Sequence, residues 1–198
     1  MKTDRQQADE RIVFELRNVG VSVASVYDLV NSKIPYPHAI PVLLKCLAEE
    51  TEPAIKEGLV RALTVKDARG IAENALLDEF EKIPTDAAPN QQLLKWAIGN
   101  ALSVVATEKT FERVAGLLRD RQHGKSREML AIALANMKSP RVVDTLIELL
   151  NDDEVAGHAL MALGKLNAQK ARPFIEPFLN HAKTWVRKEA SKALAKLG

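Results

Sequence analysis

The chain has a single cysteine and few aromatic residues. Cys46 is the only cysteine among 198 residues, so no disulfide can form within the chain. It lies among Leu43, Leu44 and Leu47, where a free cysteine packs as a small apolar side chain, and no neighbouring base is present to activate it. Aromatic residues make up only 5%. We therefore expect a buried, inert thiol in a core built from Leu, Ala, Val and Ile.

Long apolar runs are missing as well. No stretch approaches the roughly 18 apolar residues of a membrane-spanning helix. The N-terminal sequence MKTDRQQADERIVF is charged and lacks the apolar run of a signal peptide. These two absences predict a cytoplasmic protein without a membrane partner.

Motifs of nucleotide-binding and hydrolytic enzymes are also absent. The sequence has no Walker-type phosphate loop, no GxGxxG, no GxSxG and no paired cysteines for zinc. The segment Gly124-Lys125-Ser126 lacks the upstream glycine and the preceding strand of a phosphate loop, so we interpret it as a turn entering a helix. The four histidines are not clustered with carboxylates. The sequence therefore predicts no catalytic residues, no metal and no cofactor.

Repetition is what the sequence has in abundance. An Ala-Leu pair recurs in five similar helical segments, and successive leucines are 39, 32, 29 and 31 residues apart. The pairs are Ala62-Leu63, Ala101-Leu102, Ala133-Leu134, Ala162-Leu163 and Ala193-Leu194. An all-helical period near thirty residues is typical of an α-solenoid, in which short amphipathic helices bury their apolar faces by stacking. The small alanine allows close approach of the helices, and the leucine fills the shared core.

The repeat predicts an all-α fold, an α-α superhelix of about six antiparallel helix pairs in one domain over residues 1–198. Residues 1–34 are predicted to form a capping pair of helices, the second of them from Ser22 to Asn31, and residues 35–198 five repeats.

Two details of the later repeats are also predicted. Asp152 or Asp153 is expected to cap a second helix, and Pro177 to bend the last first helix.

The last three repeats resemble HEAT repeats of the short type found in bacteria and in relatives of bilin lyases. The segments DDEVAGHALMALGKL and TWVRKEASKALAKLG carry the resemblance, through Val-Arg, then Ala, then Ala-Leu-Gly-Lys-Leu. It covers residues 35–198, weakens in the first two repeats, and is broken in the fourth by Ala156 where the fifth has Arg187. The resemblance implies an armadillo-type solenoid but no particular activity, because HEAT arrays serve many unrelated functions.

A column of basic residues stands seven positions before the repeated leucines. Its members are Lys56, Lys95, Arg127 and Arg187, with Ala156 in the fourth unit. The column resembles the arginine ladder of HEAT proteins, whose members bond acidic or carbonyl groups at the turn between the two helices. Candidate partners are Glu50, Asp120 and Asn180. The alternative is a cationic stripe that binds an acidic ligand.

In such arrays the second helices are expected to line the concave surface with which solenoids bind. The predicted binding residues are the basic column and the polar or large residues between core positions: Lys56, Glu57, Arg61, Lys95, Trp96, Asn100, Arg127, Glu128, Met161, Arg187, Lys188 and Lys192. Trp96 lies off the apolar stripe of its helix, either in a partner contact with Lys95 and Arg61 or folded over the loop at 83–90. Trp185 is expected to seal the C-terminal end.

These features predict a non-enzymatic scaffold or adaptor that binds a protein or peptide partner on its concave surface. The net charge of +2 is small for a groove that holds nucleic acid. It is unevenly spread, with 12 Lys/Arg against 15 Asp/Glu in residues 1–100 and 16 against 11 in residues 101–198. The alternative is a HEAT-type enzyme or accessory resembling alkylpurine DNA glycosylases or bilin lyases. HEAT-type deoxyhypusine hydroxylases hold iron with His-Glu pairs, and no histidine here is followed by Glu.

Overall fold

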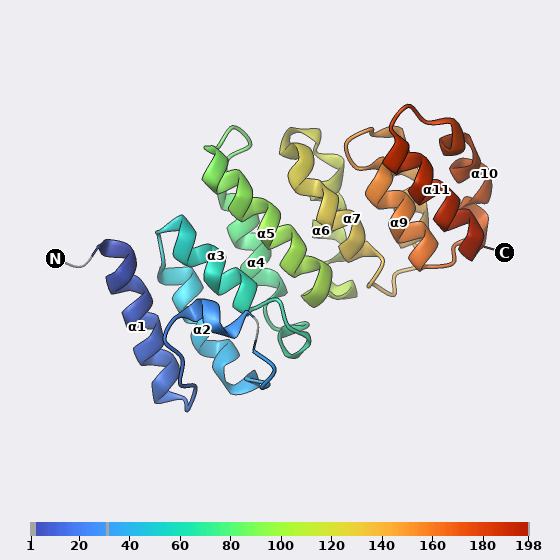
Figure 1. Ribbon diagram of the computed structural model, residues 1–198. Coiled ribbons are helices and arrows are strands. Elements are labelled where there is room, and N and C mark those ends of the chain that lie inside the picture. Colours follow the sequence, from blue (N-terminus) through green and yellow to red (C-terminus); the bar gives the residue numbers. More distant parts are fainter. Residues whose placement is uncertain (1–2, 31, 198) are drawn as a thin grey trace. The chain divides into compact units, whose positions relative to one another are not determined.

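The computed structural model describes residues 3–30 and 32–197 (Figure 1). Within these residues all regular structure is helical, with eleven α-helices joined by short 3-10 helices and no strand. The chain divides into two compact units, Met1–Ala106 and Thr107–Gly198. The all-α prediction is confirmed, whereas one continuous domain over residues 1–198 stays a prediction.

The first unit contains five α-helices. They are α1 (Asp4–Asn18), α2 (Ile40–Glu49), α3 (Pro53–Ala62), α4 (Glu73–Lys82) and α5 (Pro89–Val105), with 3-10 helices η1 (Val26–Leu29), η2 (Pro37–Ala39) and η3 (Lys66–Ala68) between them. Helices α2 and α4 are first helices, α3 and α5 are second helices, and α3 packs directly against α5. Cys46 of α2 is buried, and its burial raises the pKa of the thiol, as expected of an inert cysteine.

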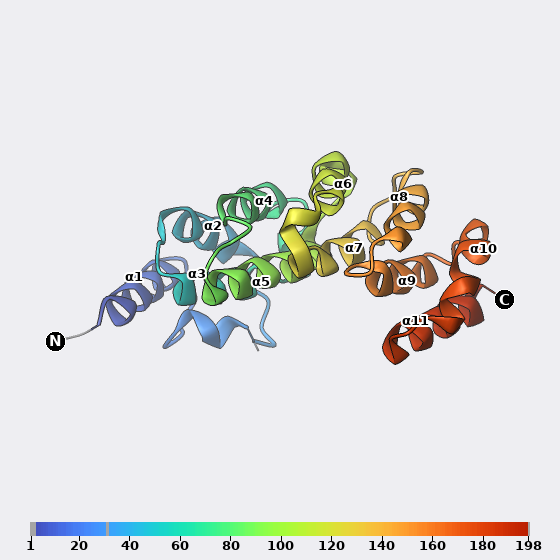
Figure 2. The same cartoon turned by 90° about the horizontal axis from the view of Figure 1, so that it is seen from above.

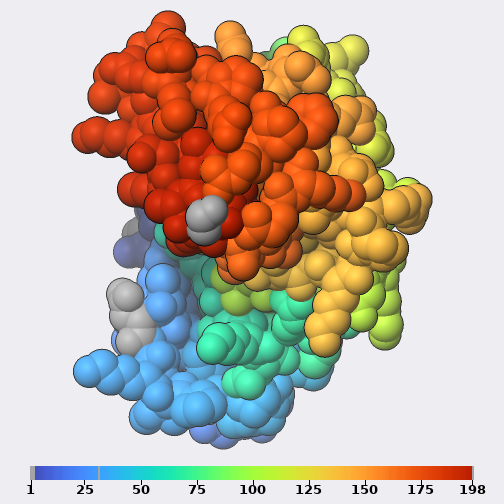
Figure 3. Space-filling view, turned by 90° about the vertical axis from the view of Figure 1, so that its right-hand side faces the viewer, coloured from blue at the N-terminus to red at the C-terminus, as the bar shows by residue number. Residues whose placement is uncertain are grey.

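The second unit contains three further repeats. Its elements are η4 (Glu108–Thr110), α6 (Phe111–Arg119), η5 (Arg121–Arg127), α7 (Glu128–Leu134), α8 (Val142–Glu148), η6 (Leu149–Asn151), α9 (Ala156–Lys165), η7 (Gln169–Ala171), α10 (Arg172–Ile175), η8 (Glu176–Asn180) and α11 (Thr184–Lys196). In Figure 2 the first helices α6, α8 and α10 of this unit lie above the second helices α7, α9 and α11. Helix α9 packs between α7 and α11. In Figure 3 the last helices of this unit, in orange and red, form one packed surface.

The repeated Ala-Leu pairs form the core, as the sequence predicts. The first four pairs are fully buried, and so is Ala193 of the last pair. Leu194 is the exception, because it keeps part of its side chain exposed. The leucine of an inner repeat is covered by the second helices of the repeats before and after it. Leu194 lies on α11, and among the described residues α11 has such a neighbour, α9, on one side.

The prediction of a second N-terminal helix over 22–31 is wrong. Only the 3-10 helix Val26–Leu29 forms there, with Ser25 as its N-cap, and Asn31 lies outside the described residues. The Asp28 carboxylate accepts hydrogen bonds from the amides of Ala24 and Ser25, which favours a tight turn over a longer helix.

This N-terminal segment packs on α3 instead of forming a helix of its own. Gly58 of α3 lacks the Cβ that would come within 2.8 Å of Val26. The hydroxyls of Tyr27 and Tyr36 donate to the carbonyls of Ala54 and Ala62, at the two ends of α3. Part of the surface of α3 that we expected to face a partner is therefore covered by the chain itself.

Pro177 and Asp152 lie at helix ends in the second unit, close to the places that the sequence predicts. The α-helical geometry of α10 gives way to the 3-10 helix η8 next to Pro177, so the α-helix ends where a bend was expected. Asp152 accepts a hydrogen bond from the amide of Glu154, in the turn before α9, rather than capping the first residue of the helix. Asp153 is exposed and makes no cap.

Gly164 allows the close approach of α9 and α11. A Cβ at this position would lie 2.8 Å from the Cα of Ala193, so the backbones touch. We expect Gly164→Ala to destabilise the second unit by about 1–3 kcal/mol, because the extra methyl has to push α11 away. Gly116→Ala is the matched control: nothing lies within 4 Å of its Cβ, and alanine at a helical position is favoured by about 0.5–1 kcal/mol over glycine.

The measurement is urea unfolding followed by tryptophan fluorescence. Each unit has one tryptophan, so a Trp96→Phe background leaves Trp185 as the reporter of the second unit. The two glycine variants should shift the free energy of unfolding in opposite directions. Equal shifts would show that α9 and α11 are not held at the contact distance described here.

Candidate binding groove

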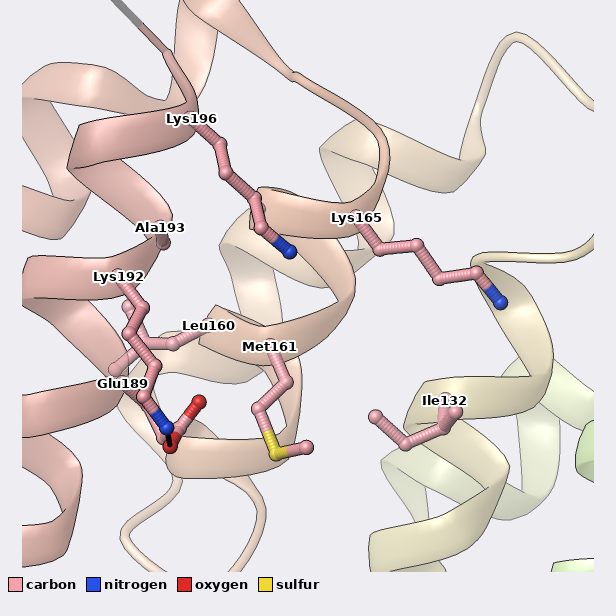
Figure 4. Close-up of a pocket in the computed structure, with 9 residues that line it drawn as sticks. Ile132, Leu160, Met161, Lys165, Glu189, Lys192, Ala193 and Lys196 are labelled. Atoms are coloured by element: carbon pink, nitrogen blue, oxygen red, sulfur yellow. Dashed lines mark hydrogen bonds and ion pairs between the residues drawn. The ribbon is translucent and has the colours of Figure 1, made fainter.

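A groove of about 230 Å³ lies on the second helices of the second unit (Figure 4). It is lined by Ile132 of α7, by Leu160, Met161, Gly164 and Lys165 of α9, and by Glu189, Lys192, Ala193 and Lys196 of α11. Its position follows from the small residues Gly164 and Ala193, which bring α9 and α11 together and leave space above their contact. Figure 4 shows Met161 between Ile132 on one side and the Glu189–Lys192 pair on the other.

Met161 makes the floor of the groove apolar. Its residue surface is 41% exposed, although a methionine in a helical repeat is ordinarily part of the core. Because the thioether side chain is flexible and polarisable, it can adapt to an apolar group that enters the groove.

Lysines flank this floor and project from it. Lys165 donates to the side-chain oxygen of Asn136 at 2.5 Å, and Lys192 donates to Glu189 at 2.7 Å. The side chain of Lys192 is 67% exposed, whereas that of Glu189 is only 17% exposed. The positive charge is therefore at the surface and its carboxylate partner is recessed.

His158 lies one helical turn before Met161 on α9 and is packed among charged and aromatic groups. Its Nε2 is 4.0 Å from the Glu128 carboxylate, and its ring centre is 5.6 Å from that of Trp185. Burial lowers the pKa of His158, although Glu128 and Glu189 both oppose that shift. The imidazole is thus neutral near pH 7, and this part of the second-helix surface has no cation from histidine.

Trp185 does not seal the C-terminal end as we expected. Its ring lies across α9, at a place where a Cβ on Gly157 would come within 1.9 Å of it. The residue remains 41% exposed beside the groove. The absence of a side chain at Gly157 explains this position, and the sequence alone could not pair two residues 28 positions apart.

Arg127 is a structural member of the basic column. It is fully buried, donates to the carbonyls of Leu118 and Gly124, and pairs with Asp152 at 2.8 Å and Glu154 at 2.9 Å. Burial alone would raise the pKa of Asp152, but the hydrogen bonds from Arg127 and the Glu154 amide lower it below its usual value. The buried charge is thus hydrogen-bonded to two carbonyls and two carboxylates.

Lys56, Lys95 and Arg187 also bond within the protein. Lys95 is fully buried, donates to the carbonyl of Ile83 at 2.6 Å, and lies over the ring of Phe80. Lys56 pairs with Glu79, and Arg187 donates to the carbonyl of His181 at 2.6 Å. These bonds favour the ladder interpretation of the column over a stripe that binds an acidic ligand. We no longer expect Lys95 or Arg127 to contact a partner, because a fully buried side chain has no surface to offer.

The predicted ladder partners are nevertheless wrong. Glu50 pairs with Arg11 of α1, and Asp120 accepts from the amide of Gln122. No bond between Asn180 and Arg187 is present among the described residues. The partner of Arg127 is instead Asp152, in the turn of the following repeat. Sequence spacing within one repeat could not reveal this contact, because it joins two repeats.

The remaining predicted residues lie on partly exposed faces of the second helices. Lys188 and Lys192 of α11 are exposed, and Glu128 begins α7 with an intermediate exposure. In the first unit Trp96 of α5 is 38% exposed, and Leu93, one turn earlier, is 52% exposed and was missed in the sequence because it reads as a core leucine.

Three other predicted residues of the first unit are partly exposed. Asn100 lies one turn beyond Trp96 on α5, and Arg61 of α3 pairs with Glu57 at 2.6 Å. The structure places each of these side chains at the surface of a second helix, and their contact with a partner stays a prediction.

The part of the chain that the structure describes has neither a cluster of metal ligands nor a helix that could span a membrane. Within residues 3–30 and 32–197 no three His, Cys, Asp or Glu side chains are grouped so that they could hold a metal ion. None of the helices formed by those residues combines the length and the apolar character that crossing a bilayer requires.

Comparison with protein families identifies the repeats. A model described as HEAT repeats matches residues 151–198, and a model described as PBS lyase HEAT-like repeat matches residues 126–152. Residues 126–198 carry HEAT repeats. The HEAT repeats run from the start of α7 to the end of the chain, so they include the whole of the groove. Among curated proteins, none is similar enough in sequence to count as a match.

Solved structures with a similar fold include a designed armadillo repeat protein and engineered proteins. A designed armadillo repeat protein in complex with the peptide (KR)4 is 18% identical, with a TM-score of 0.51, and the alignment covers 100% of this chain and 95% of that one. Two engineered proteins, each 18% identical with a TM-score of 0.53, align with 94% and 99% of this chain and with 96% and 99% of their own lengths. These similarities confirm the armadillo-like α-solenoid class. Repeat solenoids of this class present extended surfaces formed by successive repeats.

Proposed function

We propose that this HEAT-repeat protein is a scaffold or adaptor that binds a protein or peptide partner on the free faces of its second helices. The observation that carries the proposal is Met161, a large apolar side chain left 41% exposed in a groove shared by three consecutive second helices. Contiguous apolar surface rimmed by polar residues is typical of interaction sites, and Ile132 and Leu160 line the groove together with Met161.

Three further observations support this function. On α5, Leu93 and Trp96 form a second exposed apolar pair, and tryptophan is one of the residues that most often dominate binding energy. A solved repeat protein of the same fold class is bound to a peptide. The groove of about 230 Å³ is also smaller than the roughly 300–1,000 Å³ of sites that enclose small molecules, which favours a side chain over a cofactor.

The test is a quantitative affinity purification from the source organism with the tagged full chain as bait. Met161→Asp, and Trp96→Ala combined with Arg61→Glu, should each reduce the recovery of a direct partner several-fold, because they remove apolar contacts or reverse a charge on the second helices. Phe174→Ala is the control, since Phe174 is 50% exposed but lies on the first helix α10.

A partner that binds as proposed is recovered by the wild type and by Phe174→Ala, and is lost from at least one second-helix variant. Equal recovery of every captured protein by all three variants would overturn the proposed function. Circular dichroism of each variant confirms that the helices are retained.

A further inference from the structure

We infer that the groove of the second unit binds an acidic peptide segment that carries one bulky apolar side chain. The inference deepens the proposed function and rests on it. It commits to the chemistry of the partner: carboxylates against the lysine rim, and an apolar side chain against Met161.

The apolar part of the site has the size of one side chain. An apolar cavity of about 150 Å³ is large enough for benzene, so the groove of about 230 Å³ has room for a leucine or phenylalanine side chain. Ile132 of α7 and Leu160 of α9 line the groove together with Met161 and extend its apolar lining. The groove is partly open rather than an enclosed cavity, as the binding of a polypeptide segment requires.

The charged part of the site selects the sign of the partner. Lys165, Lys192 and Lys196 line the groove, and Lys188 is exposed one turn before Lys192 on α11. Opposing them on these helices are two carboxylates, Glu128 and Glu189, whose side chains are only 21% and 17% exposed.

The cations are therefore the groups that an approaching partner meets first. The four lysines outnumber the two recessed carboxylates, and His158 adds no charge near pH 7 because burial lowers its pKa. The whole second unit agrees in sign, with 16 Lys/Arg against 11 Asp/Glu in residues 101–198. Such a surface attracts and orients an acidic segment and repels a basic one.

This preference is opposite to that of the designed armadillo protein in complex with (KR)4, whose ligand is basic. A peptide fits the site better than duplex DNA for one further reason. The centre of the groove is apolar and lies between helices. A phosphate group placed over Met161 would lose bound water and gain no hydrogen bond there in return, which is unfavourable.

The test is fluorescence anisotropy with the full chain and three labelled peptides of equal length. Each carries one central leucine, surrounded by Asp and Glu, by Ser and Gln, or by Lys and Arg. We expect the acidic peptide to bind at least about ten-fold more tightly than the neutral one, and the basic one least. Binding of the acidic peptide should weaken between about 0.1 M and about 1 M salt, as the Debye length falls from about 10 to about 3 Å.

Variants locate the interaction. Lys192→Glu combined with Lys196→Glu should weaken binding of the acidic peptide about ten-fold or more. A fourth peptide, acidic but with serine in place of the central leucine, should bind the wild type more weakly than the leucine peptide, and Met161→Asp should abolish that difference. Lys109→Glu is the control, because Lys109 is an exposed lysine of the same unit that does not line the groove. It should leave the affinity unchanged.

The outcomes separate this inference from the proposed function. The inference is overturned, and the proposed function is not, if the neutral or basic peptide binds as tightly as the acidic one while Met161→Asp still weakens the binding of these peptides. An acidic-peptide Kd weaker than about 1 mM, or tighter binding of duplex DNA that Lys192→Glu with Lys196→Glu removes, also overturns the inference. The proposed function fails only if the purified partners are insensitive to the second-helix variants.

Discussion

Replacing Arg127 by methionine is expected to lower the free energy of unfolding of the second unit by about 3–5 kcal/mol. The side chain is fully buried and donates to two carbonyls and two carboxylates, so its removal leaves several polar groups without a partner. Among them is Asp152, whose carboxylate is itself nearly buried. Methionine keeps most of the volume of the arginine stem, so the loss measures the charge and its hydrogen bonds rather than a cavity.

Arg119→Met is the matched control for this prediction. Arg119 pairs with Glu148 at 2.9 Å, almost the distance of the Arg127–Asp152 pair. The side chains of Arg119 and Glu148, however, are both about half exposed. An ion pair in water contributes about 0–1 kcal/mol, because solvent screens it and already satisfies both charges. Urea unfolding followed by Trp185 fluorescence measures both variants. Similar losses for the two arginines would contradict the structural role of Arg127.

Truncation of a repeat leucine is the second large effect that we expect. Leu134→Ala and Leu163→Ala should each destabilise the second unit by about 2–5 kcal/mol, because both side chains are fully buried and alanine leaves a cavity between stacked helices. Since one repeat supports the next, the loss should appear in the unfolding of the whole unit and not in a local segment. The same fluorescence measurement, with circular dichroism as a second probe, tests this cooperativity.

Leu179→Ala controls for the substitution itself. Leu179 of η8 is 43% exposed, so the variant should stay within about 0.5 kcal/mol of the wild type. A loss below about 1 kcal/mol in either repeat-leucine variant would show that the Ala-Leu register does not define the core.

The contrast between the two sets of basic residues shows where sequence reasoning reached its limit. The spacing of Lys95 and Arg127 relative to the repeated leucines identified them as one column, and the ladder was one of two interpretations. Only the structure distinguished between them, by placing Lys95 against the carbonyl of Ile83 and Arg127 against Asp152. The exposed candidates Met161 and Lys192 had the weaker signal in the sequence, yet they line the groove.

The sequence by itself determined the helical repeats, the buried Ala-Leu core and the HEAT resemblance. It could do so because the spacing of apolar residues along one helix indicates which face of that helix is buried. Tertiary structure alone decided three other features: the packing of Tyr27 on α3, the pairing of Arg127 with Asp152, and the groove above Gly164 and Ala193. Each depends on contacts between helices that are distant along the chain. A periodic pattern predicts which side of a helix is covered, but the geometry of packing decides which residues cover it and where space is left open.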